Sequence, residues 1–416
     1  MKKILTGIAL LALSGSVLAG GLKAPVTLPN AKTLPQGVRN FNYIGVFTNP
    51  ESKMDEAGNK TVLADPLFKN ITGNTLIGGK ADASEAAGIF QKLAAANIDP
   101  NQVLAQTTGQ INMAVQANVP VFAYGLTKKL TAAIIIPITH VETNVDMGVN
   151  HIDPAAIQKL LNEINESSGA SVKEEEAIRK LMAPASEKAA EYGYKNPRNE
   201  KYTRLGDIKV AGKYKTFENA ANAVSITTAV VLPTGEQEDI NKLVDVPGGD
   251  GQTDLELGVV HDFYATEWLT LTTSAGYIFQ LADTTAKRIP EKDDSKLSKE
   301  VDYAPERDLG DIMKAELAGS IYLGGWTMGL GYGIQHKQRD KYSGGFVAAN
   351  RYRFLEKNTR QRMQTLQASL GFDTISMFKK KKFFAPMGVS LGHTRVLEGK
   401  NVVSSPLTSV MFKMFF

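Results

Sequence analysis

Blocks of ten or more residues along the chain alternate between apolar positions and polar or small positions. From Trp326 to Gln335, a bulky apolar side chain stands at every second position, with threonine, glycine or glutamine between. The blocks at 205–215 and 253–263 repeat this pattern. Successive side chains of a β-strand point to opposite faces, so each block predicts a strand with one apolar face. Sandwich strands are about five or six residues long, whereas a tilted membrane strand needs about 9–11, so the pattern favours a transmembrane β-barrel.

The blocks predict an all-β chain in which residues 38–416 form one antiparallel barrel of about 12 strands, with 14 as the alternative count. The connections alternate between long and tight, as external loops and periplasmic turns do in outer-membrane barrels. The longest external loops are predicted near 49–109 and 141–203. The strands are predicted near 38–48, 110–124, 129–140, 204–217, 221–233, 251–263, 268–280, 308–323, 326–338, 360–376, 382–395 and 404–416.

Three stretches in the two longest loops have the apolar spacing of helices. They are predicted at 153–165, where Asp153 is a good N-cap and Pro154 a good first residue, at 172–192 and at 84–97. Their apolar stripes need a partner. Either the loops pack over the barrel mouth, or the stripes form a surface where a hydrophobic ligand first binds. The residues predicted for this surface are Phe90, Leu160, Leu161, Ile164, Ile178 and Leu181.

The two ends of the chain carry targeting signals. Met1-Lys2-Lys3 followed by an apolar stretch predicts a signal peptide over residues 1–19, with cleavage after Ala19. Residues 20–37 are then a short periplasmic N-terminal segment or a partial plug. At the other end a strand of alternating apolar residues finishes on Phe416. It resembles the C-terminal signal that barrel-assembly machinery recognises, so this machinery is an expected partner, beside outer-membrane lipid and lipopolysaccharide.

Composition removes several classes of function. Lys+Arg total 47 against 43 Asp+Glu, so the chain lacks the basic surplus of a nucleic-acid binder and no nucleic-acid partner is expected. The chain has 0 Cys, which excludes disulfides, thiolate metal sites and catalytic thiols. No cofactor and no metal are expected. After the signal peptide, no apolar run approaches the roughly 18 residues of a membrane helix.

Charged residues on the predicted lumen face are mixed in sign. Opposite charges inside a barrel usually pair with each other or with a plug, so we interpret them as structural rather than ion-selective. The residues predicted to line the lumen are Asp207, Lys209, Lys213, Asp254, Glu256, Glu316 and Arg362.

The histidines do not form a catalytic pattern. The alternation places His261, His336 and His393 on the outward face, whereas His140 and His151 fall in the third external connection. A barrel hydrolase would need a histidine beside a serine near the outer rim. An enzyme is therefore not predicted and no catalytic residue is assigned; a rim-sited hydrolase stays the third hypothesis.

Several segments resemble the meta-pathway phenol-degradation family of outer-membrane transporters, distant relatives of the long-chain fatty acid transporters. They are Leu205-Gly206-Asp207 with Lys213-Tyr214, Val231-Leu232-Pro233-Thr234-Gly235, Gly251 to Asp254 with Gly258 and Gly276-Tyr277, and Asn118 to Thr127. The resemblance implies passive uptake of hydrophobic small molecules, such as aromatic hydrocarbons or fatty acids, across the outer membrane of a Gram-negative bacterium. It also implies a plugged barrel with sideways escape of the ligand into the membrane. The alternative hypothesis is a general or solute-selective porin.

Overall fold

Twelve strands close a barrel in the computed structural model, which describes residues 22–63, 70–74, 83–168, 190–195, 199–242, 244–293, 295 and 297–416. Neighbouring strands are antiparallel, and β1 closes the ring by pairing with both the last strand and β5. The predicted all-β barrel and its count of 12 strands are thereby confirmed. In chain order the barrel strands are β1 (Arg39–Thr48), β5 (Val103–Gly125), β6 (Leu130–Ile135), β9 (Lys209–Glu218), β10 (Asn222–Val231), β11 (Asp254–Tyr264), β12 (Leu269–Gln280), β17 (Ile312–Leu323), β18 (Trp326–Lys337), β20 (Gln361–Asp373), β21 (Met387–Lys400) and β23 (Leu407–Phe415).

The alternation of the sequence becomes an apolar outer wall. On β18, Trp326 and Leu330 are exposed on the outside, whereas Gly331 and Gln335 are buried on the inside. The same division holds on β11, where Leu257 is exposed and Asp262 is buried. Since an apolar side chain gains nothing from facing water, this surface suits a bilayer.

Tight turns join the strands at one end of the barrel, the turn end. Gly324 and Gly325 connect β17 to β18 with φ values of 57° and 99°, the left-handed conformation that a two-residue hairpin needs. A Cβ at Gly325 would lie 2.8 Å from the carbonyl oxygen of Asp373. The long connections gather at the opposite end, the loop end, which faces the outside in outer-membrane barrels.

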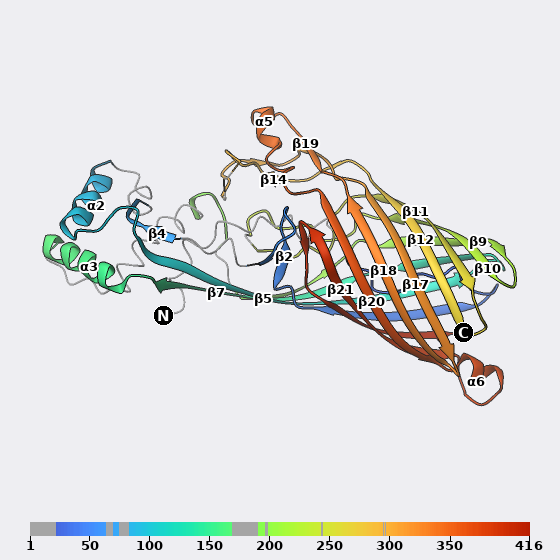
Figure 1. Ribbon diagram of the computed structural model, residues 1–416. Coiled ribbons are helices and arrows are strands. Elements are labelled where there is room, and N and C mark those ends of the chain that lie inside the picture. Colours follow the sequence, from blue (N-terminus) through green and yellow to red (C-terminus); the bar gives the residue numbers. More distant parts are fainter. Residues whose placement is uncertain are drawn as a thin grey trace.

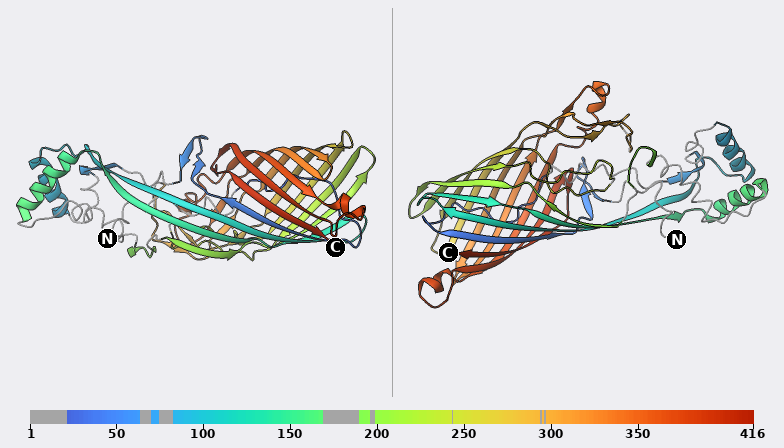
Figure 2. Two further views of the ribbon diagram at one scale, coloured as in Figure 1. Left: turned by 90° about the horizontal axis from the view of Figure 1, so that it is seen from below. Right: turned by 180° about the vertical axis from the view of Figure 1, so that it is seen from behind.

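An arm extends from the loop end of the barrel (Figures 1 and 2). It consists of the first half of β5 and of β7 (Ile138–His151), which pair from Ala105↔His151 to Asn118↔Ile138. β8 (Glu200–Leu205) pairs with the base of β7 and β4 (Asn70–Thr72) with the start of β5. The predicted loops 49–109 and 141–203 were therefore too long. Residues 103–109 and 141–151 are strands whose pairing continues beyond the membrane.

Two helices lie at the far tip of the arm, distant from the barrel (Figure 1). They are α2 (Ala83–Ala95) and α3 (Pro154–Ser168), close to the predicted ranges. The Asp153 carboxylate accepts the backbone N–H of Ala156 at 2.9 Å, as its N-cap role predicts. The expectation that these helices cover the barrel mouth is wrong, because their apolar stripes pack on each other and on the end of β5. Most of the predicted helix at 172–192 lies outside the described residues.

Small elements complete the fold. None of the helices in the described ranges is long and apolar enough to span a membrane. The remaining strands are β2 (Ser52–Met54), β3 (Lys60–Val62), β13 (Asp283–Thr284), β14 (Lys287–Arg288), β15 (Val301–Asp302), β16 (Glu306–Asp308), β19 (Lys341–Ser343) and β22 (Val402–Val403), and the remaining helices are α5 (Ala349–Tyr352) and α6 (Ile375–Lys379).

Candidate functional site

Residues 22–37, called the plug below, run through the barrel lumen from the loop end to the turn end. Their hydrogen bonds reach strands all round the wall, so the segment is held from several sides. The sequence left two readings for residues 20–37, and the contacts of residues 22–37 are those of a plug. From loop end to turn end, the bonds run from Leu22 N to Gln361 Oε1 (2.7 Å), Gln335 Nε2 to Lys23 O (3.0 Å), Thr394 Oγ1 to Pro25 O (2.7 Å), Lys213 Nζ to Asn30 O (2.8 Å), Ala31 N to Asp262 Oδ2 (3.0 Å), Ser225 Oγ to Ala31 O (2.6 Å) and Leu34 N to Thr131 Oγ1 (2.8 Å).

The barrel wall is shaped to accept the plug. A Cβ at Gly329 or Gly331, on the inner face of β18, would lie 2.3 or 2.5 Å from the side chain of Leu28. A Cβ at Gly125 would lie 2.0 Å from the carbonyl oxygen of Pro35. These distances are below any normal contact, so glycine is needed where plug and wall meet. The small residues between the outward apolar ones therefore make room for chain rather than for water.

Buried apolar clusters hold the plug at both ends. At the loop end, Leu22 and Ala24 pack against a cluster formed by Met54, Met363, Val396 and Val402. Near the turn end, Ala31 is fully buried with Ala223 and Val260. Burial of an apolar side chain favours association by roughly 1.5–3 kcal/mol for the larger ones, so both clusters add to the hydrogen bonds.

Most of the predicted lumen charges face inward and find partners there. Lys209 forms an ion pair with Glu256 at 2.5 Å, and Lys213 donates to the plug. Asp254 is buried and accepts a bond from Gln252 Nε2 at 3.1 Å. Glu316 lines a small cavity beside Pro25 and Leu28 of the plug. Pairing within the wall or with the plug suits a structural role for these charges.

Asp207 fastens an external loop to the barrel. It lies between β8 and β9, where its carboxylate accepts the backbone N–H groups of Gly235 (2.8 Å) and Asp250 (3.0 Å). Thr234 Oγ1 donates to the carbonyl oxygen of Gly206 at 3.1 Å. The Leu-Gly-Asp and Pro-Thr-Gly segments on which the family resemblance rests are thus in direct contact. Together they anchor the start and the end of loop 232–253.

Arg362 is a correction to the predicted lumen lining. It lies on the outward face of β20, directly opposite His336 of β18, and its side chain is exposed. The inner positions are taken by Met363, Thr365 and Gln367, all buried. Polar residues stand on both faces of this part of β20, so hydropathy alone did not distinguish the inside from the outside.

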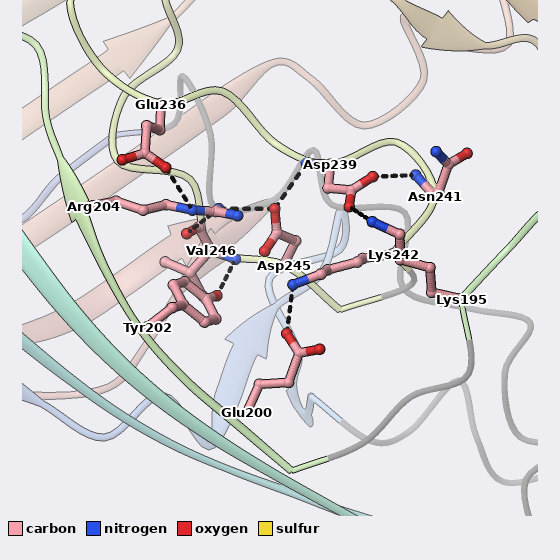
Figure 3. A network of polar contacts seen from close by, with 10 residues as sticks. All are labelled: Lys195, Glu200, Tyr202, Arg204, Glu236, Asp239, Asn241, Lys242, Asp245 and Val246. Carbon is pink, nitrogen blue, oxygen red and sulfur yellow. Dashed lines mark hydrogen bonds and ion pairs between the residues drawn. The ribbon is translucent and has the colours of Figure 1, made fainter.

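A polar network covers the base of the arm (Figure 3). Arg204 at the end of β8 binds the Asp245 carboxylate and the Val246 carbonyl oxygen, both at 2.8 Å. The hydroxyl of Tyr202 accepts the N–H of Val246 at 2.9 Å, and burial raises the pKa of Tyr202 to about 12. Lys242 pairs with Glu200 at 2.5 Å. Loop 232–253 is thereby bound to β8 as well as to Asp207.

An apolar cluster lies under this network. Val246 and Leu63 are buried there against the inner face of the arm, which is formed by Ile111, Met113 and Val141. The opposite face carries polar side chains such as Asn112 and Gln116. Loops rather than lipid thus cover the apolar face of the arm, which explains why the strands can leave the bilayer.

The residues predicted as a first-contact surface divide into three groups. Leu160 and Leu161 are 5% and 4% exposed in the core of the arm tip. Phe90 on α2 is 54% exposed. Ile164 belongs to α3 but its side chain is not described, and Ile178 and Leu181 lie outside the described residues. Only Phe90 is therefore placed by the structure on a free apolar surface.

The histidines make contacts of a structural kind. His140 Nδ1 lies 2.7 Å from the Thr203 hydroxyl, and His393 Nδ1 lies 3.1 Å from the Thr408 hydroxyl. No group of three or more histidines and carboxylates that could bind a metal occurs in the described ranges.

Comparisons with known proteins bear on the fold. No protein family model and no curated protein matches the chain. A crystal structure of an outer membrane channel from Pseudomonas putida F1 is similar, with TM-score 0.54 and 11% identity over 94% of this chain and 100% of that chain. The P. putida toluene transporter TodX gives TM-score 0.35 at 10% identity, covering 99% and 98%, and the NanC porin gives 0.33 at 9%, covering 75% and 98%. These last two scores are too low to carry an argument. The first likeness and the closed ring of twelve strands make the chain an outer-membrane β-barrel with a channel fold.

Proposed function

We propose that the protein mediates passive uptake of hydrophobic small molecules, such as aromatic hydrocarbons or fatty acids, across the outer membrane. The observation that carries this proposal is the plug. A general porin needs a water-filled channel, whereas here residues 22–37 fill the lumen and are bonded to the wall from Gln361 to Thr131. A solute must therefore displace the plug or pass beside it.

The chemistry at the loop end supports an apolar solute. The plug begins there in the cluster of Met54, Met363, Val396 and Val402 with Leu22. Methionine adapts to ligands of varied shape, since it has three rotatable bonds and a polarisable sulfur. An apolar solute can replace contacts within such a cluster, whereas a sugar or an ion cannot. The family resemblance in the sequence narrows the class to aromatic hydrocarbons or fatty acids.

A solute-selective porin is the second candidate. Inward-facing charges such as Lys209 and Glu256 would line a polar channel if the plug were to leave. A hydrolase has less support, because His140 and His393 are bonded to threonines and not to a serine. We therefore propose a role without catalysis.

Uptake by cells tests the proposal. We expect that expression in a porin-deficient Gram-negative host raises accumulation of radiolabelled toluene or of a labelled long-chain fatty acid. Because the lumen is filled, permeation of a small sugar should stay at the level of the empty host. Sugar permeation without hydrocarbon or fatty acid uptake would replace the proposal by the porin hypothesis.

The arm tip provides a second test, since we propose that Phe90 is where an apolar ligand first binds. Phe90→Ser should lower toluene uptake, because it removes an exposed apolar ring without opening a core. Leu160→Ser with Leu161→Ser should instead unfold the tip, since truncating each buried leucine costs roughly 2–5 kcal/mol.

Phe346→Ser is the matched control, since Phe346 is an exposed aromatic of the loop that contains β19 and α5 (61% exposed). Its uptake should equal that of the native chain. Heat-modifiable migration of the barrel should be unchanged in all these variants. Equal uptake by the Phe90 and Phe346 variants would show that the tip takes no part in ligand capture.

A further inference from the structure

Basic residues gather on the outer surface of the wall at the loop end of β18, β20 and β21. Arg362 lies opposite His336 on one side and opposite Lys400 on the other. Arg395 is outward on β21, opposite Leu366. We call Arg362, Arg395 and Lys400 the cationic rim. All three side chains are exposed, and none of the ion pairs between described residues involves them.

The depth of these residues follows from strand geometry. Trp326 marks the turn end of the apolar band on β18, and His336 lies ten positions further along the strand. Ten steps of about 3.3 Å along a strand tilted by about 40° rise roughly 25 Å, which is the height of the apolar band of outer-membrane barrels. His336 and its neighbour Arg362 therefore lie at the outer boundary of the bilayer, at the level of lipid headgroups.

The positive charge is confined to this sector. The outward positions of β10, β11, β12 and β17 carry no lysine, arginine, aspartate or glutamate over their described lengths. On β17, for example, they are Met313, Ala315, Leu317, Gly319, Ile321 and Leu323. A cationic side chain on the lipid face is unfavourable, with a cost that falls from about 2–4 kcal/mol at the midplane to about 0–1 near the interface. One sector of the wall thus tolerates this cost and the other does not show it.

The arrangement within the rim calls for an anion. Like charges directly opposite each other on paired strands are destabilising, since their Cβ atoms are about 4.5–5.5 Å apart. Arg362 and Lys400 are such a pair. The acidic residue beside them, Glu398, accepts a bond from Gln364 Nε2 at 2.9 Å. One carboxylate does not balance three cations.

We propose that the cationic rim binds the phosphate groups of the lipopolysaccharide in the outer leaflet. A phosphorylated glycolipid supplies the anion at the right depth, and its acyl chains would lie on the apolar wall beside Leu366 and Leu330. Arginine presents a planar fork that matches phosphate oxygens, and lysine adds a point charge. This interaction is independent of the proposed transport, because it involves only the outer face of the barrel.

The test uses the full chain purified in mild detergent from a host that makes lipopolysaccharide. The variant Arg362→Gln with Arg395→Gln and Lys400→Gln removes the rim while keeping side chains of similar length. We expect native mass spectrometry to show lipopolysaccharide bound to the native chain and at least tenfold less on the variant, a change of about 1.4 kcal/mol by the relation ΔG = RT ln K.

Lys128→Gln with Lys129→Gln and Lys380→Gln is the matched control, with the same charge change among exposed residues at the turn end. It should retain lipopolysaccharide like the native chain. Inorganic phosphate should not displace the lipid at equal phosphate concentration, whereas purified lipopolysaccharide should rebind to the stripped native chain. Displacement by inorganic phosphate would point to a simple anion site. Equal retention by a correctly folded rim variant, judged by heat-modifiable migration, would overturn the proposal.

Discussion

Deleting residues 22–34 is expected to turn the closed barrel into a pore that conducts ions. The segment touches β6, β9, β10, β11, β18, β20 and β21, and its removal leaves inward polar groups without their partners. Lys213 and Asp262, which bond to the backbone of residues 30 and 31, would then face water. A polar lumen of this kind conducts ions in porins. We expect single-channel conductance in planar bilayers to rise by an order of magnitude or more.

The control for this deletion is Lys32→Gln. Lys32 belongs to the plug, but its side chain reaches only the exposed Tyr322 hydroxyl, at 3.4 Å. Its conductance should stay at the low level of the native chain. Strand pairing holds the barrel without the plug, so the deleted protein should still migrate as a folded barrel before heating. If the deleted barrel stays closed, other parts of the chain block the lumen.

Locking the plug to the wall is expected to abolish uptake of hydrophobic solute. Ala31 and Ala223 are 0% and 1% exposed in one buried cluster, and the Ser225 hydroxyl donates to the Ala31 carbonyl oxygen at 2.6 Å. Ala31→Cys with Ala223→Cys therefore places two thiols where plug and β10 meet. The native chain has 0 Cys, so oxidation can form only this disulfide within the protein. Toluene uptake should fall to background on oxidation and return on reduction.

Ala223→Cys alone, treated with the same oxidant, controls for damage by the reagent. It should keep native uptake, because no partner thiol is present. Native uptake by the fully cross-linked double variant would mean that solute bypasses the plug. That outcome would refute plug movement but would leave hydrophobic uptake itself intact, since toluene accumulation is measured directly.

Local pattern was sufficient for the barrel. An alternation of period two depends only on neighbouring residues, and a strand with one apolar face needs a bilayer or a core to cover it. The twelve strands, the tight turn at Gly324-Gly325 and the helix after Asp153 were accordingly predictable. The same applies to the inward orientation of Lys213 and Glu256, whose strands have clearly apolar opposite faces.

Tertiary contacts decided the rest. The plug has no periodicity, and its position depends on bonds between residues as distant in sequence as Leu22 and Gln361. The arm leaves the bilayer because Leu63 and Val246, brought there by loops, cover its apolar face. Arg362 faces outward because Met363 and its neighbours fill the lumen side of a strand whose two faces are both polar. The sequence alone thus determined the elements that hydropathy specifies locally. Which surface covers each apolar or polar face depended on distant parts of the chain, because burial is a property of the folded molecule.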